Sequence, residues 1–249
     1  YSFIRLSGSM HNHYYLLKWL IPNSILIFAG IGAWHFGFLF QLYSNDKSYI
    51  STLITIVYLI CSFYCLYRLY FISNQINLIV KIKNIFEHES KTELLIENDV
   101  VCIKPNIRLK KHTQLNDFLK NIITKKKIDY YSNNQTLLEI FADKLSSESK
   151  IGSFVSDALF KLGLLGTIIG FVLMLQPISS LNSFDEIAIK NALTSMTAGM
   201  SIALFTTLAG LVGGLLLKIQ YYFLESATSY LFYNTSEISE IFLIPKSKL

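Results

Sequence analysis

The sequence predicts an all-α integral membrane protein with four transmembrane helices. Hydrophobic residues make up 52% of the 249 residues and charged residues only 16%, and the mean hydropathy is +0.41. A soluble domain of this length carries more charge. Four apolar runs are each close to or above the roughly 20 residues that cross a bilayer as a helix. They lie at about residues 19–43, 50–72, 153–176 and 190–218.

Residues 1–9 are expected to be an artificial leader, because Ser7-Gly8-Ser9-Met10 is typical of an engineered junction and Met10 suits a native start. Residues 10–72 then form an N-terminal transmembrane hairpin. Its first span opens on Lys18-Trp19, a pair that anchors helices at the membrane surface. His35 lies near the outer end of this span, where interfacial packing is favoured over a functional role.

The second span is rich in Tyr, Phe and Ile and has almost no small residues, which predicts a lipid-facing outer helix. Cys61 and Cys65 stand one helical turn apart within it. Thiols buried among apolar side chains are the favoured interpretation, and a metal-binding pair is the weaker one. The three cysteines of the chain predict no disulfide framework.

Residues 73–152 are predicted to be a cytoplasmic helical segment, since 13 of the 22 Lys and Arg residues lie there. By the positive-inside rule both chain ends are then cytoplasmic. A nucleic-acid surface is disfavoured, because five acidic residues between 87 and 99 dilute the positive field. Val100–Ile103 is expected to be a short extended piece. Two apolar helical faces follow, formed by Leu115, Phe118, Leu119 and Ile122 and by Leu138, Phe141 and Leu145.

A helix is expected to start at Thr136, which has capping-box spacing with Glu139, and to run nearly straight into the third span unless Gly152 kinks it. Residues 153–220 form a second hairpin, and residues 221–249 a cytoplasmic C-terminal helix and tail. Small residues recur at helical spacing in this hairpin, and in lipid such faces mark close helix packing. The predicted packing residues are Gly163, Gly166, Gly170, Gly199, Ala203, Gly210 and Gly214.

Thr167 and Thr207 lie near mid-membrane, because each is about 14 to 17 residues from the end of its helix at 1.5 Å per residue. They are candidate pore-lining residues, and Thr206 and Ser201 are taken with them. Hydrogen bonding within the helix plus packing is an equally open interpretation of the threonine hydroxyls. For Ser201 packing alone is the alternative.

A proton relay normally needs a titratable group within the bilayer, and these spans supply none beyond His35. If the protein conducts protons, another chain is expected to bring the carboxylate. The sequence shows no Ser-His-Asp, metal-ligand or phosphate-loop pattern, so we expect no enzyme activity, no cofactor and no bound metal.

Two segments of this hairpin carry a resemblance. Leu162–Gly170 resembles the Gly-Leu-(Phe/Leu)-Gly-Thr-x-x-Gly segment of the MotA/TolQ/ExbB proton channel family, and Ala203–Leu211 is similar to its Ala-Thr-Ala-x-Gly-Leu segment. The resemblance implies a bacterial inner-membrane subunit that forms a homopentamer around a dimer of a single-span ExbD/TolR/MotB-like partner. It also implies that the partner's membrane aspartate sits among pore threonines, which Thr167 and Thr207 match.

One departure concerns the glutamate that ExbB and TolQ proteins place five residues before the last-span threonine, since Ile202 stands there. The four-span layout is closer to the flagellar stator, whereas the threonine segments are closer to ExbB, TolQ and the anti-phage Zorya subunits. The branch therefore stays open.

The predicted function is an ion-conducting stator or motor subunit in which a proton gradient drives motion of the partner. A sodium-driven version is an alternative, because threonine oxygens also coordinate a hard cation. A non-conducting oligomeric membrane scaffold is the second hypothesis. A secondary transporter ranks last, because the two halves of the chain differ in composition and length.

Overall fold

The computed structural model describes residues 14–37, 40, 48–88, 94–97, 100–103, 107–109, 113–128, 134–179 and 186–241. The expected start at Met10, most of the loops that join the spans of each hairpin, and the last residues of the C-terminal tail lie outside these ranges.

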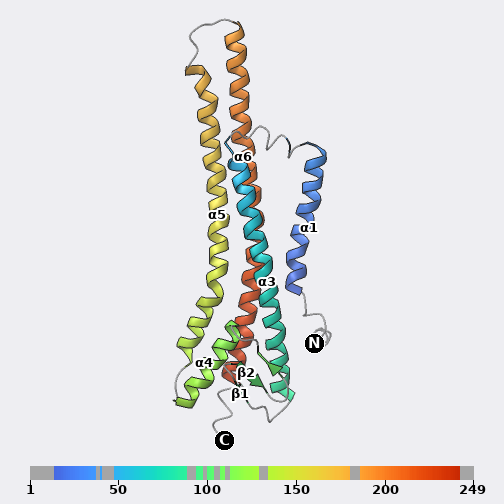
Figure 1. Cartoon of the computed structure of the whole chain (residues 1–249), viewed down its shortest axis with the longest axis vertical. Helices are drawn as coiled ribbons and strands as arrows, with labels where there is room; N and C mark the ends of the chain where they lie inside the picture. The colour runs from blue at the N-terminus through green and yellow to red at the C-terminus, as the bar shows by residue number, and fades with distance from the viewer. Residues whose placement is uncertain are drawn as a thin grey trace. The chain divides into compact units, whose positions relative to one another are not determined.

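Within the described ranges the chain forms five helices and three short strands (Figure 1). Their bounds are α1 Tyr14–His35, α3 Ile50–His88, β1 Leu94–Glu97, β2 Val100–Ile103, β3 Ile107–Arg108, α4 Gln114–Ile128, α5 Gln135–Ser179 and α6 Glu186–Ile241. Helices α1, α3, α5 and α6 are long and apolar enough to cross a membrane. The prediction of four membrane-spanning helices is confirmed at this level.

Three of these helices are much longer than a bilayer requires. Helix α3 has 39 residues, α5 has 45 and α6 has 56, or about 58, 68 and 84 Å at 1.5 Å per residue. A hydrocarbon core is only about 30 Å thick. Each helix therefore continues well beyond its apolar stretch, and the polar part of each sequence belongs to the same helix.

One helix boundary differs from the sequence prediction. Helix α1 ends at His35 rather than near residue 43, because Gly37 adopts a left-handed φ of +74° and its N–H donates to the Trp34 carbonyl at 3.0 Å. Helix α5 continues through Gly152, as expected of a helix that runs into the third span. An alanine Cβ at Gly152 would overlap the Tyr221 ring, so this glycine makes room for an aromatic side chain of α6.

The chain divides into two compact units. We call residues 19–66 and 151–221 the span unit, and residues 1–18, 67–150 and 222–249 the sheet unit. The core of the span unit contains fully buried apolar side chains from α3, α5 and α6, namely Ile54, Leu159, Ile202 and Leu217. Helix α1 contributes little to this core, since none of its most apolar window is buried.

The sheet unit contains an antiparallel three-stranded meander in the order β1-β2-β3. The sequence predicted extended structure only at β2, so this sheet is an addition to the helical fold. Helix α4 packs on it through Asn116, whose side-chain oxygen accepts the Val101 N–H at 2.9 Å. Thr113 caps the start of α4 by accepting the Asn116 N–H at 3.3 Å.

The predicted apolar face of α4 is confirmed, because its four side chains are each at most 4% exposed: Leu115, Phe118, Leu119 and Ile122. Phe118 stacks on Phe141 of α5, with ring centroids 4.4 Å apart, and Phe141 lies 6.1 Å from Phe232 of α6. Three helices therefore meet in one aromatic cluster within the sheet unit.

Two ion pairs join other helices of the sheet unit. Lys83 of α3 contacts Glu237 of α6 at 2.8 Å. Arg68 of α3 pairs with Glu148 of α5, with side chains 13% and 21% exposed. Burial raises the pKa of the Glu148 carboxyl, and the Arg68 guanidinium offsets part of that shift.

Candidate functional site

Helices α5 and α6 approach each other at backbone distance within the span unit. An ideal Cβ built on Gly210 would lie 2.7 Å from the Gly163 Cα, and one built on Gly170 would lie 2.6 Å from the Ala203 nitrogen. A Cβ on Gly199 would lie 2.6 Å from the Met174 nitrogen. Any larger residue would force the helices apart, so these glycines set the spacing between α5 and α6. The two helices run antiparallel to each other (Figure 1).

Two further positions complete this contact. A Cβ on Gly166 would lie 2.4 Å from the Thr206 Oγ1, and one on Gly214 would lie 2.8 Å from the Phe160 ring. The buried Ser156 hydroxyl donates to the Gly214 carbonyl at 2.7 Å and so links α5 to α6 directly. Sequence reasoning missed Ser156, although it stands seven residues before Gly163 and therefore on the same helical face.

Thr206 occupies a different position from the one the sequence suggested. Its side chain is 0% exposed, and its hydroxyl donates to the Ile202 carbonyl at 2.8 Å while lying against Gly166. In this chain Thr206 is a packing residue between the helices and lies on no exposed face. The two neighbouring threonines are about 100° apart around the helix, and only the position of α5 decides which of them is covered.

Thr167 of α5 and Thr207 of α6 are both half-buried. The Thr207 hydroxyl donates to the Ala203 carbonyl at 2.8 Å, and the Thr167 hydroxyl donates to the Leu164 carbonyl at 2.6 Å. Each hydroxyl proton is therefore engaged within its own helix. Each oxygen keeps lone pairs that can accept a hydrogen bond or coordinate a cation.

A hollow of about 400 Å³ begins at Thr167. Its lining is mostly apolar and comes from both helices: Thr167, Ile168, Phe171, Val172, Met174, Met200 and Ala203. Ser201 is half-buried and is not among these lining residues. The Thr167 hydroxyl is thus the polar group at one end of an apolar groove.

The part of the hairpin that surrounds the two threonines contains no ionisable side chain. No Asp, Glu, Lys or Arg occurs between Lys161 and Asp185 on the α5 side, or between Lys190 and Lys218 on α6. Ile202, which replaces the glutamate of the ExbB and TolQ pattern, is 2% exposed and belongs to the packed core. Any charge at the level of the threonines must therefore come from outside this pair of helices.

A second polar site, which sequence reasoning missed, lies elsewhere in the span unit. The Gln220 amide nitrogen donates to the Asn23 Oδ1 at 2.8 Å and to the Tyr58 hydroxyl at 3.0 Å, so α6, α1 and α3 are joined. The buried Cys65 thiol donates to the Gln220 carbonyl at 3.6 Å. The sequence did hold a signal for this site, namely an amide side chain in each of two apolar runs, because polar groups in lipid need hydrogen-bond partners.

His35 is the last residue of α1, is exposed and contacts the Phe36 ring edge-on at 5.8 Å. Across the part of the chain that the structure describes, no three His, Cys, Asp or Glu residues are grouped as metal ligands would be. The side chain of Cys102 lies outside the described set.

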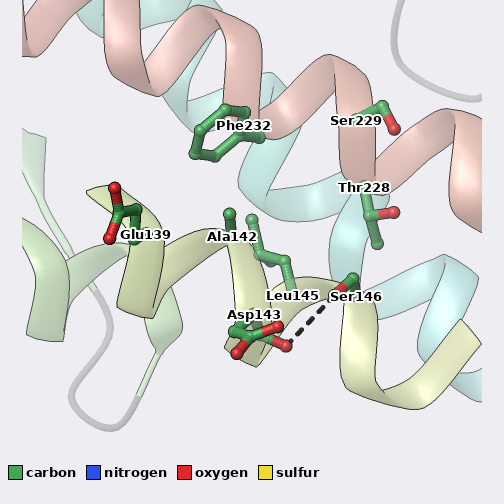
Figure 2. A pocket seen from close by; sticks show the side chains of 8 residues that line it. All are labelled: Glu139, Ala142, Asp143, Leu145, Ser146, Thr228, Ser229 and Phe232. Atoms are coloured by element: carbon green, nitrogen blue, oxygen red, sulfur yellow. Dashed lines mark hydrogen bonds between the residues drawn. The ribbon is translucent and has the colours of Figure 1, made fainter. Parts of the chain in front are cut away.

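The sheet unit has a hollow of its own, of about 440 Å³, between α5 and α6 (Figure 2). Phe232, Thr228 and Ser229 come from α6, and the α5 side carries Glu139 and Asp143. Both carboxylates have partners within the chain. Glu139 accepts from the Gln135 amide at 3.2 Å, and Asp143 pairs with Lys150 at 3.2 Å.

Four helices long and apolar enough to cross a membrane define a multi-pass membrane protein. A family model for the MotA/TolQ/ExbB proton channel family matches residues 111–235, which is half of the chain. The chain belongs to this family. No curated protein and no solved structure matches it in sequence or fold comparison.

The matched region includes α4, α5 and most of α6, and so contains both threonines. The family is of the channel type and is not a known enzyme family, and its members work with a single-span partner. The match is to the family as a whole and does not select a branch.

Proposed function

We propose that this protein is an ion-conducting subunit of a membrane motor, with the proton as the driving ion. Five copies would surround a dimer of a single-span partner, and the partner's membrane aspartate would lie beside Thr167 and Thr207. The observation that carries this proposal is the pair of half-buried threonines, one on each of two closely packed helices, in a stretch where neither helix supplies a charge.

The hydrogen bonds of these two hydroxyls favour a role in lining an ion path over a role in relaying protons. Both protons are held by helix carbonyls, so the oxygens act as acceptors. An acceptor suits a protonated carboxylic acid, a hydronium ion or a water chain. The same oxygens can also coordinate Na⁺, which keeps a sodium-driven motor as the alternative ion choice.

Orientation follows from charge. The Lys and Arg residues concentrate in 73–152, so we place that segment and both chain ends on the cytoplasmic side of a bacterial inner membrane. The two short loops, residues 41–49 and 177–189, then face the outer side.

The test is ion flux into vesicles that hold the full chain together with its single-span partner. The double variant Thr167→Val and Thr207→Val keeps side-chain shape but removes both acceptors. We expect proton flux to fall at least tenfold, because a hydrogen bond to a charged group contributes about 1.5–3 kcal/mol and 1.4 kcal/mol corresponds to a factor of ten.

The matched control is Thr194→Val, whose exposed hydroxyl also bonds its own helix, at the Lys190 carbonyl at 2.9 Å. Its flux should equal that of the unmodified protein. Unchanged flux in the double variant would refute the threonine path. An intact oligomer without flux in the unmodified protein would favour the scaffold, and flux driven only by a sodium gradient would replace the proton.

A further inference from the structure

An ion pair joins α5 to α6 at the end of the hairpin opposite the apolar groove. The Lys218 Nζ lies 3.4 Å from the Asp157 Oδ1, and the two side chains are 61% and 55% exposed. We propose that Asp157 and Lys218 form the inner mouth of the ion path, with Asp157 as the carboxylate that accepts each proton leaving the threonines. This proposal rests on the proposed function.

The helical phase places the pair below the threonines. Lys218 follows Thr207 by 11 residues, a rotation of about 20° from the same face and a rise of about 16 Å. Asp157 precedes Thr167 by 10 residues, about 80° around α5 and about 15 Å along it. Because the two helices are antiparallel, as the Gly163–Gly210 and Gly170–Ala203 contacts require, both displacements run in the same direction.

The pair also contains the first carboxylate that the path meets on the inner side of the threonines. Moving inward from Thr207, the first charged residue on α6 is Lys218. On α5 the first charged residue is Lys161, and the first carboxylate is Asp157 one turn further. The threonine hydroxyls do not ionise at neutral pH, so they can guide a proton but cannot store one.

The Asp157–Lys218 ion pair adds little to the stability of the hairpin. Two side chains that are more than half exposed gain little from a contact of 3.4 Å, because water screens the attraction. The hairpin is already held by backbone contacts such as Gly163–Gly210 and by the Ser156 hydrogen bond. The fold therefore does not depend on these two charges, and they can act on the conducted ion.

The proposed step is a simple proton transfer. A proton that leaves the groove at Thr167 crosses the remaining distance of about 15 Å along water. A hydronium ion beside Asp157 then gives its proton to the ionised carboxylate, which leaves one water molecule and a neutral carboxylic acid. That acid then protonates a water molecule on the cytoplasmic side and regains its charge. The positive charge of Lys218, 3.4 Å from the carboxylate, repels metal cations that could block the mouth.

The experiment measures initial proton flux in vesicles that hold the full chain and its partner, together with the Tm of each variant. Asp157→Asn should lower flux at least fivefold while the Tm stays within about 2 °C of the unmodified protein. Asp157→Glu should retain most of the flux. The control Asp143→Asn removes another exposed, Lys-paired carboxylate, 83% exposed against 55% for Asp157, from the sheet unit and should change neither measurement.

A charge swap separates a proton acceptor from a structural bond. The variant Asp157→Lys with Lys218→Asp keeps opposite charges in contact but moves the carboxylate to α6. We expect it to remain below half of the normal flux. Full flux in the swap, or a fall in Tm that matches the loss of flux in Asp157→Asn, would show a structural pair and overturn the proposal.

Failure of this proposal and failure of the proposed function are distinguishable. Normal flux in Asp157→Asn, with flux lost in the Thr167→Val and Thr207→Val double variant, would reject the inner mouth and keep the threonine path. Normal flux in the double variant, or no flux in the unmodified protein, would reject the path, and the inner mouth with it.

Discussion

Replacing Gly210 with alanine tests whether backbone contact holds α5 against α6. An alanine Cβ at this position would lie 2.7 Å from the Gly163 Cα and 2.8 Å from the Leu159 carbonyl oxygen. Ordinary contact begins at 3.4 Å, so the helices must separate by about 0.7 Å (3.4 minus 2.7). Both obstacles are backbone atoms, which cannot rotate away as the end of a side chain can.

The magnitude follows from a comparison with Gly213, three residues further along α6. An alanine Cβ there would meet only side-chain atoms at ordinary distances, Ile54 at 3.6 Å and Leu159 at 3.9 Å. Both substitutions gain the same helix propensity, about 1 kcal/mol. The difference between them is therefore the overpacking cost at Gly210, which is about 1–3 kcal/mol.

The assay is thermal unfolding in detergent micelles, followed by the loss of helical circular dichroism. We expect Gly210→Ala to melt about 2–12 °C below Gly213→Ala, at about 2–4 °C per kcal/mol for a chain of this size. Gly213→Ala itself should be at least as stable as the unmodified protein. A Gly210→Ala variant that melts at or above the Gly213→Ala variant would refute the backbone contact.

Two further predictions concern buried polar contacts. Gln220→Leu removes the donor to Asn23 and should destabilise the protein by about 1 kcal/mol, because interhelical hydrogen bonds in membranes average about 0.6 and reach about 1.7 kcal/mol. Hydrogen exchange along α1 should then rise, and unchanged exchange would show that this amide does not anchor α1. Glu148→Gln leaves the mostly buried Arg68 without its counter-charge and should cost about 1–3 kcal/mol by thermal unfolding, the cost of a buried polar group that loses its partner. The exposed-pair variant Asp143→Asn should cost about 0–1 kcal/mol, and an equal effect of the two would contradict the burial argument.

The sequence anticipated the features that depend on local periodicity. The four membrane helices follow from the length of their apolar runs. The buried face of α4 follows from 3.6-residue spacing, as Leu115 and Ile122 show. Boundaries were less predictable, because the end of α1 depends on the left-handed φ of Gly37, and a Gly-containing apolar run reads equally well as continuous helix.

The site was only partly predictable for a similar reason. Spacing identified the small residues of α5 and α6 but could not say which of two adjacent threonines faces the partner helix. Gln220 and Asn23 are 197 positions apart, so no local pattern connects them. An amide side chain within an apolar run indicates that a hydrogen-bond partner is needed, but it does not identify that partner.

The sequence by itself determined a four-helix membrane protein with small-residue faces and a charge-free stretch around two threonine positions. These properties depend on the order of residues along one helix. Only the tertiary structure decided that Thr206 is covered by Gly166 while Thr167 and Thr207 remain half-buried, and that Asp157 pairs with Lys218. The physical reason is that coverage and charge pairing depend on the second helix, whose rotation and depth are set by backbone contacts between glycines distant in the chain.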